Sequence, residues 1–410
     1  MGLYCGIDWA TEHHDVAVVD DDGRVVARGR VDNDAGGFAQ LLTLLAEAGD
    51  TAKHPIPVGI ETDRGLWVAA LRATGRVIYP INPLAASRYR ARYAVSGAKS
   101  DATDAVLLAN IIRTDPDAHR PLPADTELAQ AIRVLARAQQ DAVWARQQVG
   151  NQIRDLLKDF YPAALVAFAG LPSGGLARAD ARTILAAAPT PAQAATLTPA
   201  RLRRLLIRAG RRRDLDRDVA RLRQVFTDTY LHQPPVVENA MGIQLSALLR
   251  QFDAVCTAAE ELAQAAIAHF ERHPDAEIIT SFPGLGNLAG ARVLAEVGDD
   301  RTRFADARGL KAFGGSAPIT RASGKKTVVL HRHIKNRRLA AVGPIWALAS
   351  LRASPGARRH FDARRAAGDW NHQAQRHLFN KFLGQLHHCL HTVQLYDEHR
   401  AFPPPLPLAA

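Results

Sequence analysis

The sequence predicts a multidomain protein in which an α/β region with a mixed sheet precedes long helices and a mainly helical carboxy-terminal domain. Three observations support this fold class. The first hundred residues alternate short apolar strands with helical segments, which is typical of an α/β order. Apolar residues then recur at helical spacing over about 125–160 and 236–272. The length of 410 residues allows two or three domains, each with its own core.

Two strands of the amino-terminal region end on acidic residues. Asp20–Gly23 predicts a hairpin turn, and Asp8 and Glu61 each follow Gly-Ile at a strand end. Acids in this position of an α/β sheet point into the crevice where ligands bind. The elements expected, in order, are strands at 3–10, 15–19 and 24–31, a helix at 35–48, a strand at 57–61, a helix at 65–74 and a strand at 77–81.

Two further acids open the next predicted helix. Asp101 and Asp104 are three residues apart, so both lie on one face of its first turn. The simpler interpretation is an N-cap together with a favourable helix-dipole charge. Together with Asp8 and Glu61, however, they form a cluster of four acids that repel one another without a cation. Such a cluster suits a pair of hard divalent cations about 3.5–4 Å apart, which serve phosphoryl transfer.

The motifs Gly-Ile-Asp8, Ile-Glu61 and Lys99-Ser-Asp101-Ala-Thr-Asp104 resemble the signature of a RuvC-like domain with the RNase H fold. That domain begins the DEDD insertion-sequence transposases, which are bridge-RNA-guided DNA recombinases. The resemblance implies that the four acids are catalytic and bind two Mg²⁺ ions, with Mn²⁺ as an alternative. Lys99 matches a basic residue that this family commonly has before the acidic pair, as one of the residues that bind nucleic acid.

The middle of the chain is helical and rich in arginine. The two long helices can form an antiparallel pair or an intermolecular coiled coil. The segment 201–223 contains Arg211, Arg212 and Arg213, and we expect it to bind nucleic-acid phosphates, although basic helices are often simply solvated. Residues 163–200 are rich in alanine and carry no recognisable chemistry.

The carboxy-terminal region contains two motifs of interest. A Pro-Gly-x-Gly turn with Gly284 and Gly286 opens a helix, so its backbone N–H groups can hold a DNA phosphate as a helix-hairpin-helix element does; a plain turn is the alternative. Ser323-Gly324 lies in a basic segment, and a serine among such cations is suited to attack a phosphodiester. Ser316 is the competing serine. The basic residues expected around Ser323 to bind nucleic acid are Lys325, Lys326, Arg332 and Arg337.

The block from about 278 to 395 resembles the second domain of the same transposases, in which Ser323 falls on the proposed nucleophile. The resemblance implies a covalent phosphoserine–DNA intermediate, donor and target DNA, and a structured guide RNA as partners. It also implies a homo-oligomer, dimer or tetramer, in which the serine of one protomer completes the metal site of another.

Composition agrees with a nucleic-acid partner. Lys and Arg exceed Asp and Glu by 52 to 41, a net charge of +11. No apolar run or signal pattern predicts a membrane span, so we expect a cytoplasmic protein, nucleoid-associated when bound to DNA. The three cysteines are far apart and in no metal-binding pair, which indicates reduced cysteines in packed positions.

The predicted domains are a catalytic RuvC-like domain at 1–125, long helices at 126–275 with an arginine-rich insert at about 163–230, a transposase domain at 276–398, and a proline-rich tail at 399–410. Three other functions remain open. A RuvC-like nuclease that hydrolyses DNA with water needs the four acids but not Ser323. An actin-like or sugar-kinase ATPase also opens with Gly-Ile-Asp, but a second phosphate loop is not evident. A non-catalytic nucleic-acid binder does not need the acids.

Overall fold

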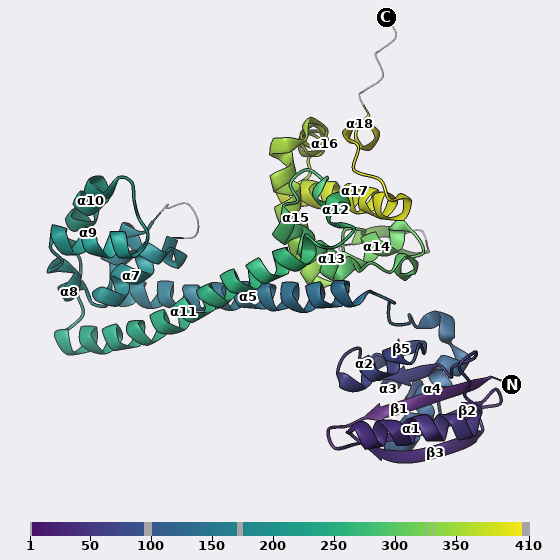
Figure 1. Cartoon of the computed structure of the whole chain (residues 1–410). Coiled ribbons are helices and arrows are strands. Elements are labelled where there is room, and N and C mark those ends of the chain that lie inside the picture. The colour runs from purple at the N-terminus through teal and green to yellow at the C-terminus, as the bar shows by residue number, and fades with distance from the viewer. Residues whose placement is uncertain (1, 94–100, 170–174, 325, 331, 404–410) are drawn as a thin grey trace, which may run out of the picture. The chain divides into compact units, whose positions relative to one another are not determined.

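The computed structural model describes residues 2–93, 101–169, 175–324, 326–330 and 332–403 (Figure 1). It forms two compact units, Met1–Ala124 and Asp125–Ala410, which we describe separately. Lys99 and Lys325 lie outside the described residues, and the side chains of Asp101 and Lys326 are not described. The further division predicted at 275/276 stays a prediction.

The first unit is built on a five-stranded mixed sheet of order β3-β2-β1-β4-β5. The strands β1, β2 and β3 are antiparallel neighbours, whereas β4 is parallel to both β1 and β5. The mixed α/β sheet expected from the sequence is therefore confirmed. The strands span β1 (Leu3–Trp9), β2 (His13–Asp20), β3 (Val25–Asp32), β4 (Val58–Ile60) and β5 (Ile78–Pro80).

Helices cover both faces of this sheet. Odd-numbered residues of β1, such as Cys5 and Ile7, pack in one core with Leu41 of α1 (Ala35–Ala48) and Leu71 of α2 (Leu66–Ala73). Even-numbered residues face α4 (Asp101–Thr114). Two further helices complete the unit, α3 (Pro83–Tyr93) and the short 3-10 turn η1 (Pro116–Ala118). The sequence pattern did not predict α3.

Two long helices lie side by side in the second unit, α5 (Glu127–Phe160) and α11 (Pro235–Phe270) (Figure 1). They run antiparallel, because Gln139 reaches the carbonyl of Ala259 while Gly150 lies against Phe252. The antiparallel pair is therefore confirmed. Between them in the chain lies the insert, which shares one core with both long helices. Its elements are α6 (Pro162–Ala167), the turn η2 (Gly175–Ala177), α7 (Ala179–Ala187), α8 (Pro191–Ala195), α9 (Pro199–Arg208) and α10 (Leu215–Thr227).

The remaining helices pack around Trp346, whose ring stacks on Phe382 at 5.0 Å between centroids. A two-stranded hairpin, β6 (Ile319–Ser323) and β7 (Lys326–Leu330), is the second sheet of the chain. The other elements are α12 (Ala276–Thr280), α13 (Asn287–Val297), the turn η3 (Arg301–Arg303), α14 (Ala307–Phe313), α15 (Arg337–Ala353), α16 (Pro355–Ala366), α17 (Asn371–Thr392) and α18 (Glu398–Ala401).

Two predictions from composition can be compared with this fold. Cys5, Cys256 and Cys389 are all free and buried, as expected for packing cysteines. Among the helices within the described ranges, none is both long enough and apolar enough to cross a bilayer.

Candidate functional site: an acidic sheet edge and an exposed serine

Two glycines set the distance between the sheet and α4. Gly6 of β1 pairs with Gly59 of β4, and both face the helix. A Cβ atom on Gly6 would lie 1.9 Å from the carbonyl oxygen of Ala105, and one on Gly59 would lie 2.9 Å from that of Leu108. The Gly-Ile that precedes each acid is therefore a requirement of packing, because only glycine lets the helix backbone lie directly on the strands.

Asp8 and Glu61 are neighbours across the parallel pair. Side chains alternate along a strand, so Asp8 shares the face of Gly6, and Glu61, which directly follows β4, shares the face of Gly59. The register pairs Gly6 with Gly59 and Ile7 with Ile60, and Asp8 and Glu61 are the residues that come next in the two chain segments. The two acids thus lie at the carboxyl ends of adjacent strands, on the α4 side, as the sequence predicts.

The direction of α4 brings its first turn to the same edge. Arg113, near the carboxyl end of α4, donates a hydrogen bond to the carbonyl of Asp21 at 2.9 Å. Asp21 follows Asp20, which pairs with Leu3 at the start of β1. The helix therefore runs opposite to β1, and its amino-terminal turn lies toward the acids. Asp101 comes one turn before Ala105, which covers Gly6, and Asp104 comes one turn before Leu108, which covers Gly59.

The carboxylate of Asp104 is buried and paired with a cation. Its Oδ1 accepts from Arg90 of α3 at 2.6 and 3.0 Å, and Asp104 is 5% exposed. Arg90 and Asp104 both line a cavity of about 460 Å³. In this arrangement Arg90 occupies one carboxylate oxygen of Asp104, so that oxygen becomes available to a metal ion only if the guanidinium moves.

A fifth acid lies beside the predicted site. Asp15 of β2 pairs directly with Asp8 and shares its face of the sheet. Arg30 of β3, the register partner of Asp15, holds its carboxylate through bonds of 2.9 and 3.2 Å. Arg30, Asp15 and Asp8 therefore form one row across β3, β2 and β1, and Glu61 follows the end of the next strand, β4. The sequence alone does not indicate Asp15 and Arg30, because only the strand register brings them to Asp8.

The carboxylates at the sheet edge have the chemistry that a divalent metal ion requires. Carboxylate oxygens are the ligands that Mg²⁺ prefers, and Asp8 and Glu61 supply them from adjacent strands. Within the part of the chain whose side chains are described, no group of three or more acids, histidines or cysteines is close enough to hold an ion. The side chain of Asp101 belongs to the residues left out, so the metal prediction stays a prediction.

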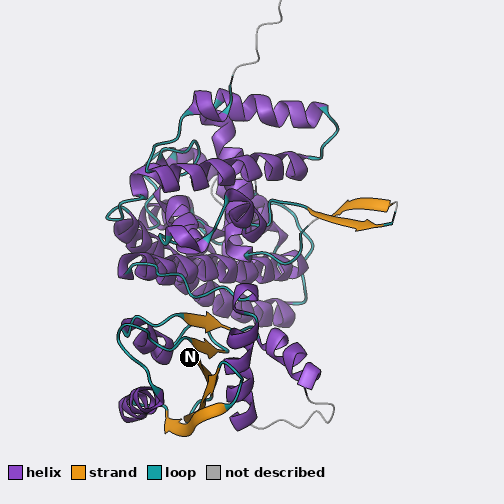
Figure 2. Cartoon of the chain, turned by 90° about the vertical axis from the view of Figure 1, so that its right-hand side faces the viewer, coloured by secondary structure: helices purple, strands orange, loops and turns teal. Residues whose placement is uncertain are grey.

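Ser323 lies at the tip of the hairpin that projects from the helical body (Figure 2). It pairs with Lys326, and Gly324 at the turn has φ +55°, a conformation that favours glycine. The expectation that Arg332 and Arg337 surround the serine is wrong. Arg332 donates to the Ala317 carbonyl at 3.3 Å, near the base of the hairpin, and Arg337 begins α15. From Ala317 to Ser323 an extended strand rises about 20 Å, so an exposed hairpin separates these arginines from its tip.

The competing serine is enclosed. Ser316 is 4% exposed, and its hydroxyl lies 2.9 Å from Oδ1 of Asn380 and 3.2 Å from the Lys311 carbonyl. A buried hydroxyl with two acceptors at hand is a structural group. Of the two serines, Ser323 is exposed and Ser316 is buried.

The Pro-Gly-x-Gly turn is used for packing. Gly284 has φ +84°, and a Cβ there would lie 2.4 Å from the Ser350 backbone nitrogen of α15. Gly286 is the N-cap of α13, and a Cβ there would meet nothing within 4 Å. Close packing against α15 thus explains why residue 284 is glycine. A phosphate contact at Gly286 stays a prediction.

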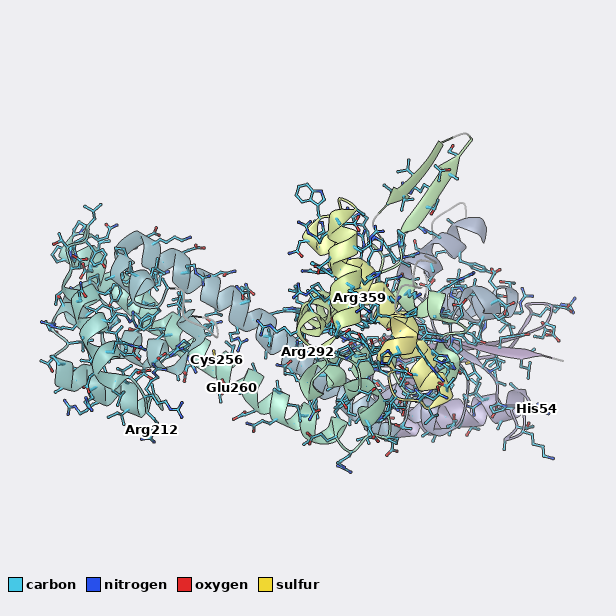
Figure 3. All side chains as sticks on the ribbon, turned by 90° about the horizontal axis from the view of Figure 1, so that it is seen from above. His54, Arg212, Cys256, Glu260, Arg292 and Arg359 are labelled. Atoms are coloured by element: carbon cyan, nitrogen blue, oxygen red, sulfur yellow. The ribbon has the colours of Figure 1, made fainter. Side chains whose placement is uncertain are left out.

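The three consecutive arginines of the insert differ in their surroundings. Arg211 pairs with Asp218 and lies 3.7 Å from Asp180, whereas Arg212 and Arg213 are exposed. Figure 3 shows Arg212 at the outer margin of the insert. The segment therefore contains one arginine fixed by acids and two that face solvent.

With this geometry established, comparison with known families defines the class of protein as transposases. Residues 5–162 match a family model described as transposase, and residues 276–362 match one described as the transposase IS116/IS110/IS902 family. Between them the two matches include all four acids and Ser323. The chain belongs to this family of insertion-sequence transposases.

Individual relatives support the assignment. The chain is 61% identical over 410 residues to the protein named as transposase for the IS117 mini-circle of Streptomyces coelicolor, covering 100% of this chain and 99% of the relative. It is 30% identical over 353 residues to the 44.8 kDa protein of insertion element IS116 of Streptomyces clavuligerus, 82% of each chain. It is 28% identical over 402 residues to the 42 kDa protein of insertion element IS900 of Mycobacterium paratuberculosis, 96% of this chain and 97% of the relative.

Proposed function

We propose that this transposase cleaves and joins DNA through a covalent serine intermediate, with Asp8, Glu61, Asp101 and Asp104 as a two-metal site of RuvC-like type. The observation that supports the proposal is the sheet edge, where Asp8 and Glu61 stand at the carboxyl ends of two adjacent parallel strands and the first turn of α4 is directed toward that edge. When bound, a pair of Mg²⁺ ions supplies charge neutralisation for phosphoryl transfer.

The exposed position of Ser323 supports the nucleophile assignment. Its hydroxyl attacks a DNA phosphorus, forming a Ser–O–P bond while the bond to one strand oxygen breaks. The serine proton passes to a base or solvent, and the departing strand oxygen takes up a proton. Joining follows when a strand hydroxyl attacks the phosphoserine and releases the serine. A hairpin tip suits this role, because it can reach a substrate that the surrounding helices do not touch.

The guide RNA is the part of the proposal that rests on family resemblance and net charge. In this proposal base pairing selects the donor and target, while the basic protein binds backbone phosphates and duplex shape. A homo-oligomer, as dimer or tetramer, supplies the several active centres that joining two duplexes requires.

A covalent-capture assay tests the chemistry. Purified protein is incubated with Mg²⁺, element-derived RNA, and matching donor and target DNA, and is then run on a denaturing gel. We expect a protein–DNA adduct that disappears in Ser323→Ala and in Asp101→Asn, and that persists in Ser316→Ala, the matched serine control. Cleavage that survives Ser323→Ala without any adduct would instead establish hydrolysis by water.

A further inference from the structure

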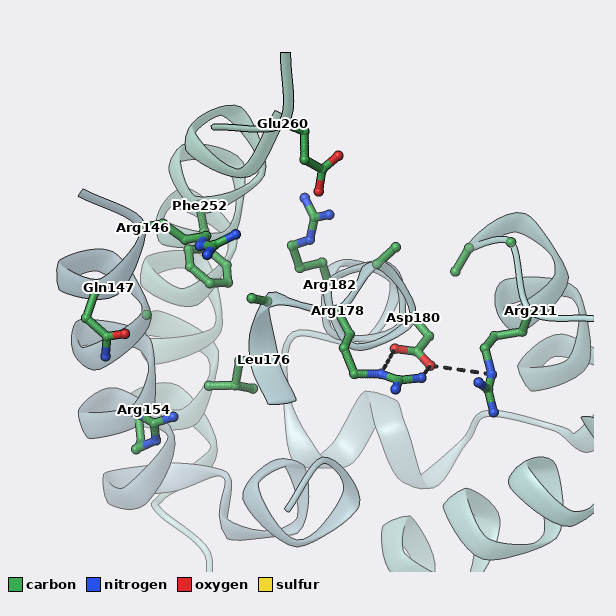
Figure 4. A pocket seen from close by; sticks show the side chains of 15 residues that line it. Arg146, Gln147, Arg154, Leu176, Arg178, Asp180, Arg182, Arg211, Phe252 and Glu260 are labelled. Carbon is green, nitrogen blue, oxygen red and sulfur yellow. Dashed lines mark hydrogen bonds and ion pairs between the residues drawn. The ribbon is translucent and has the colours of Figure 1, made fainter. Parts of the chain in front are cut away.

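A second site lies in the insert, away from the acids and the serine. A cavity of about 780 Å³ opens between α5 and the insert helices, and it is lined by five arginines against one aspartate and one glutamate (Figure 4). The arginines are contributed by three parts of the chain: Arg146 and Arg154 by α5, Arg178 and Arg182 by the start of α7, and Arg211 by the loop after α9.

Acids hold some of these guanidinium groups in place. Asp180, itself buried, accepts from Arg178 at 2.6 and 3.0 Å and lies 3.7 Å from Arg211. Arg211 also pairs with Asp218, and Arg182 pairs with Asp253. Figure 4 shows Arg178, Asp180 and Arg211 on one side of the cavity and Arg146 and Arg154 on the other. Fixed cations on one wall thus face less constrained cations across the cavity.

Some hydrogen-bonding capacity in this cluster is unused. Among the residues that the structure describes, the buried Nε of Arg182 has no hydrogen-bond partner, and the buried Nε of Arg211 has only the Asp180 carboxylate at 3.7 Å, beyond hydrogen-bond distance. Buried donors are nearly always satisfied, so orphaned N–H groups in the lining of a cationic cavity indicate that an acceptor binds there. Guanidinium groups match the oxygens of phosphate through two parallel hydrogen bonds.

We propose that this cavity binds backbone phosphates of an unpaired nucleic-acid strand, such as a loop or bulge of a structured RNA. Its size decides between strand types. A cavity of 780 Å³ admits a phosphate with its nucleotide, whereas a duplex is too wide to enter. Unpaired nucleotides can be splayed out of a fold and enter concave sites. The inference takes its partner class, nucleic acid, from the proposed function, but it does not depend on metal or on Ser323.

The test uses the full-length chain in EDTA and without donor or target DNA, so failure of the cleavage chemistry cannot affect it. The key variant is Arg146→Ala/Arg154→Ala, because Arg154 is exposed and, among the described residues, neither arginine forms an ion pair on which the insert core depends. The matched control is Arg358→Ala/Arg359→Ala, which removes the same charge from the exposed face of α16. Circular dichroism verifies folding, and Arg146→Lys/Arg154→Lys tests recovery.

Fluorescence anisotropy then measures affinity for labelled 20-nucleotide oligouridylate, oligothymidylate and a 20-base-pair RNA duplex. We expect single-strand binding to weaken about tenfold in the key variant, with a salt-dependence slope reduced by about 1–2. We expect the control to lose less than twofold, and the lysine variant to recover part of the affinity. The oligouridylate and oligothymidylate arms tell whether RNA, DNA or both enter the cavity.

Three results would overturn the proposal. The first is unchanged single-strand affinity in the key variant, and the second is an equal loss for the duplex, which would indicate general surface charge. The third comes from arginine modification by phenylglyoxal. We expect oligouridylate to protect Arg146 and Arg154 but not Arg359. Equal protection by inorganic phosphate at the same concentration would assign the cavity to a free anion.

Discussion

Replacement of Gly6 by alanine should separate α4 from the sheet. The new Cβ would lie 1.9 Å from the Ala105 carbonyl oxygen and 2.5 Å from the Ala109 nitrogen, and both atoms belong to the helix backbone. An ordinary contact needs more than about 3 Å, so the helix must move by over 1 Å. Overpacking of this kind costs about 3 kcal/mol, at the upper end of its usual range, because no flexible side chain can yield.

Two other glycines provide a graded comparison. At Gly59 the closest atom is 2.9 Å away, so alanine there should cost only about 1–2 kcal/mol. Gly36 is exposed on α1 and has only the Asp34 carboxylate nearby at 3.3 Å, so alanine should be neutral or stabilising by about 0.5 kcal/mol. The expected order of destabilisation is Gly6→Ala, then Gly59→Ala, then Gly36→Ala.

Hydrogen exchange followed by mass spectrometry reads this effect locally, on peptides that cover 3–9 and 101–114. A loss of about 3 kcal/mol in the free energy of local unfolding means that α4 and β1 open about a hundredfold more often. The same displacement moves Asp101 and Asp104 relative to Asp8, so adduct formation should fall as well. If Gly6→Ala exchanges no faster than Gly36→Ala, the claim that glycine sets the position of α4 is refuted.

Three further predictions concern individual side chains. Burial lowers the pKa of His14 by more than the hydrogen bond to Asn33 raises it. The first unit should therefore lose stability as pH falls below about 6.5. In the His14→Gln variant, Tm should change less between about pH 5 and 7.5. Burial raises the pKa of Asp180, but Arg178 and other partners outweigh it and hold that pKa below its usual value. Stability of the insert is therefore present above about pH 4 and lost below it, and Asp180→Asn should abolish this acid dependence in thermal unfolding. Arg30→Met removes the guanidinium that pairs with the buried Asp15 carboxylate, so it should lower stability by about 1 kcal/mol in urea unfolding, whereas Arg28→Met, at an exposed position, should not.

Local sequence signals predicted elements whose ends are capped and whose cores are apolar. The helix expected at 35–48 spans Ala35–Ala48, because Asp34 caps its start and Gly49 ends it with φ 113°. The two long helices were likewise predicted to within two residues, since their apolar stripes extend over many turns. The Gly-Ile-acid pattern is also local, and it indicated the acidic sheet edge because each acid directly follows the apolar residues of a strand.

Features set by tertiary contact were not predictable. Among the side chains of α3 that the structure describes, Ala86 and Tyr89 are the buried apolar ones, which is too weak a pattern to predict a helix. The hairpin β6–β7 is mostly exposed, and its strands have no alternation of apolar and polar residues, so the sequence indicates only a Ser-Gly turn in a basic segment. Asp15 reaches Asp8 only through strand register, and the arginines of the insert cavity meet only after α5 and α7 have packed together.

The connection between α5 and α11 has a consequence for the order of folding. Residues 161–234 separate the two helices, so forming the helix pair closes a long loop, at an entropic cost that is smaller once the loop is compact. The helices of the insert follow one another closely in the sequence, so we expect them to fold early and bring Phe160 and Pro235 together as the turn of a helical hairpin. Zipping of the pair would then proceed from this turn toward Ile132 and Phe270, which complete the carboxy-terminal core. The insert is thus a folding nucleus for a domain whose sequence is mostly made after it.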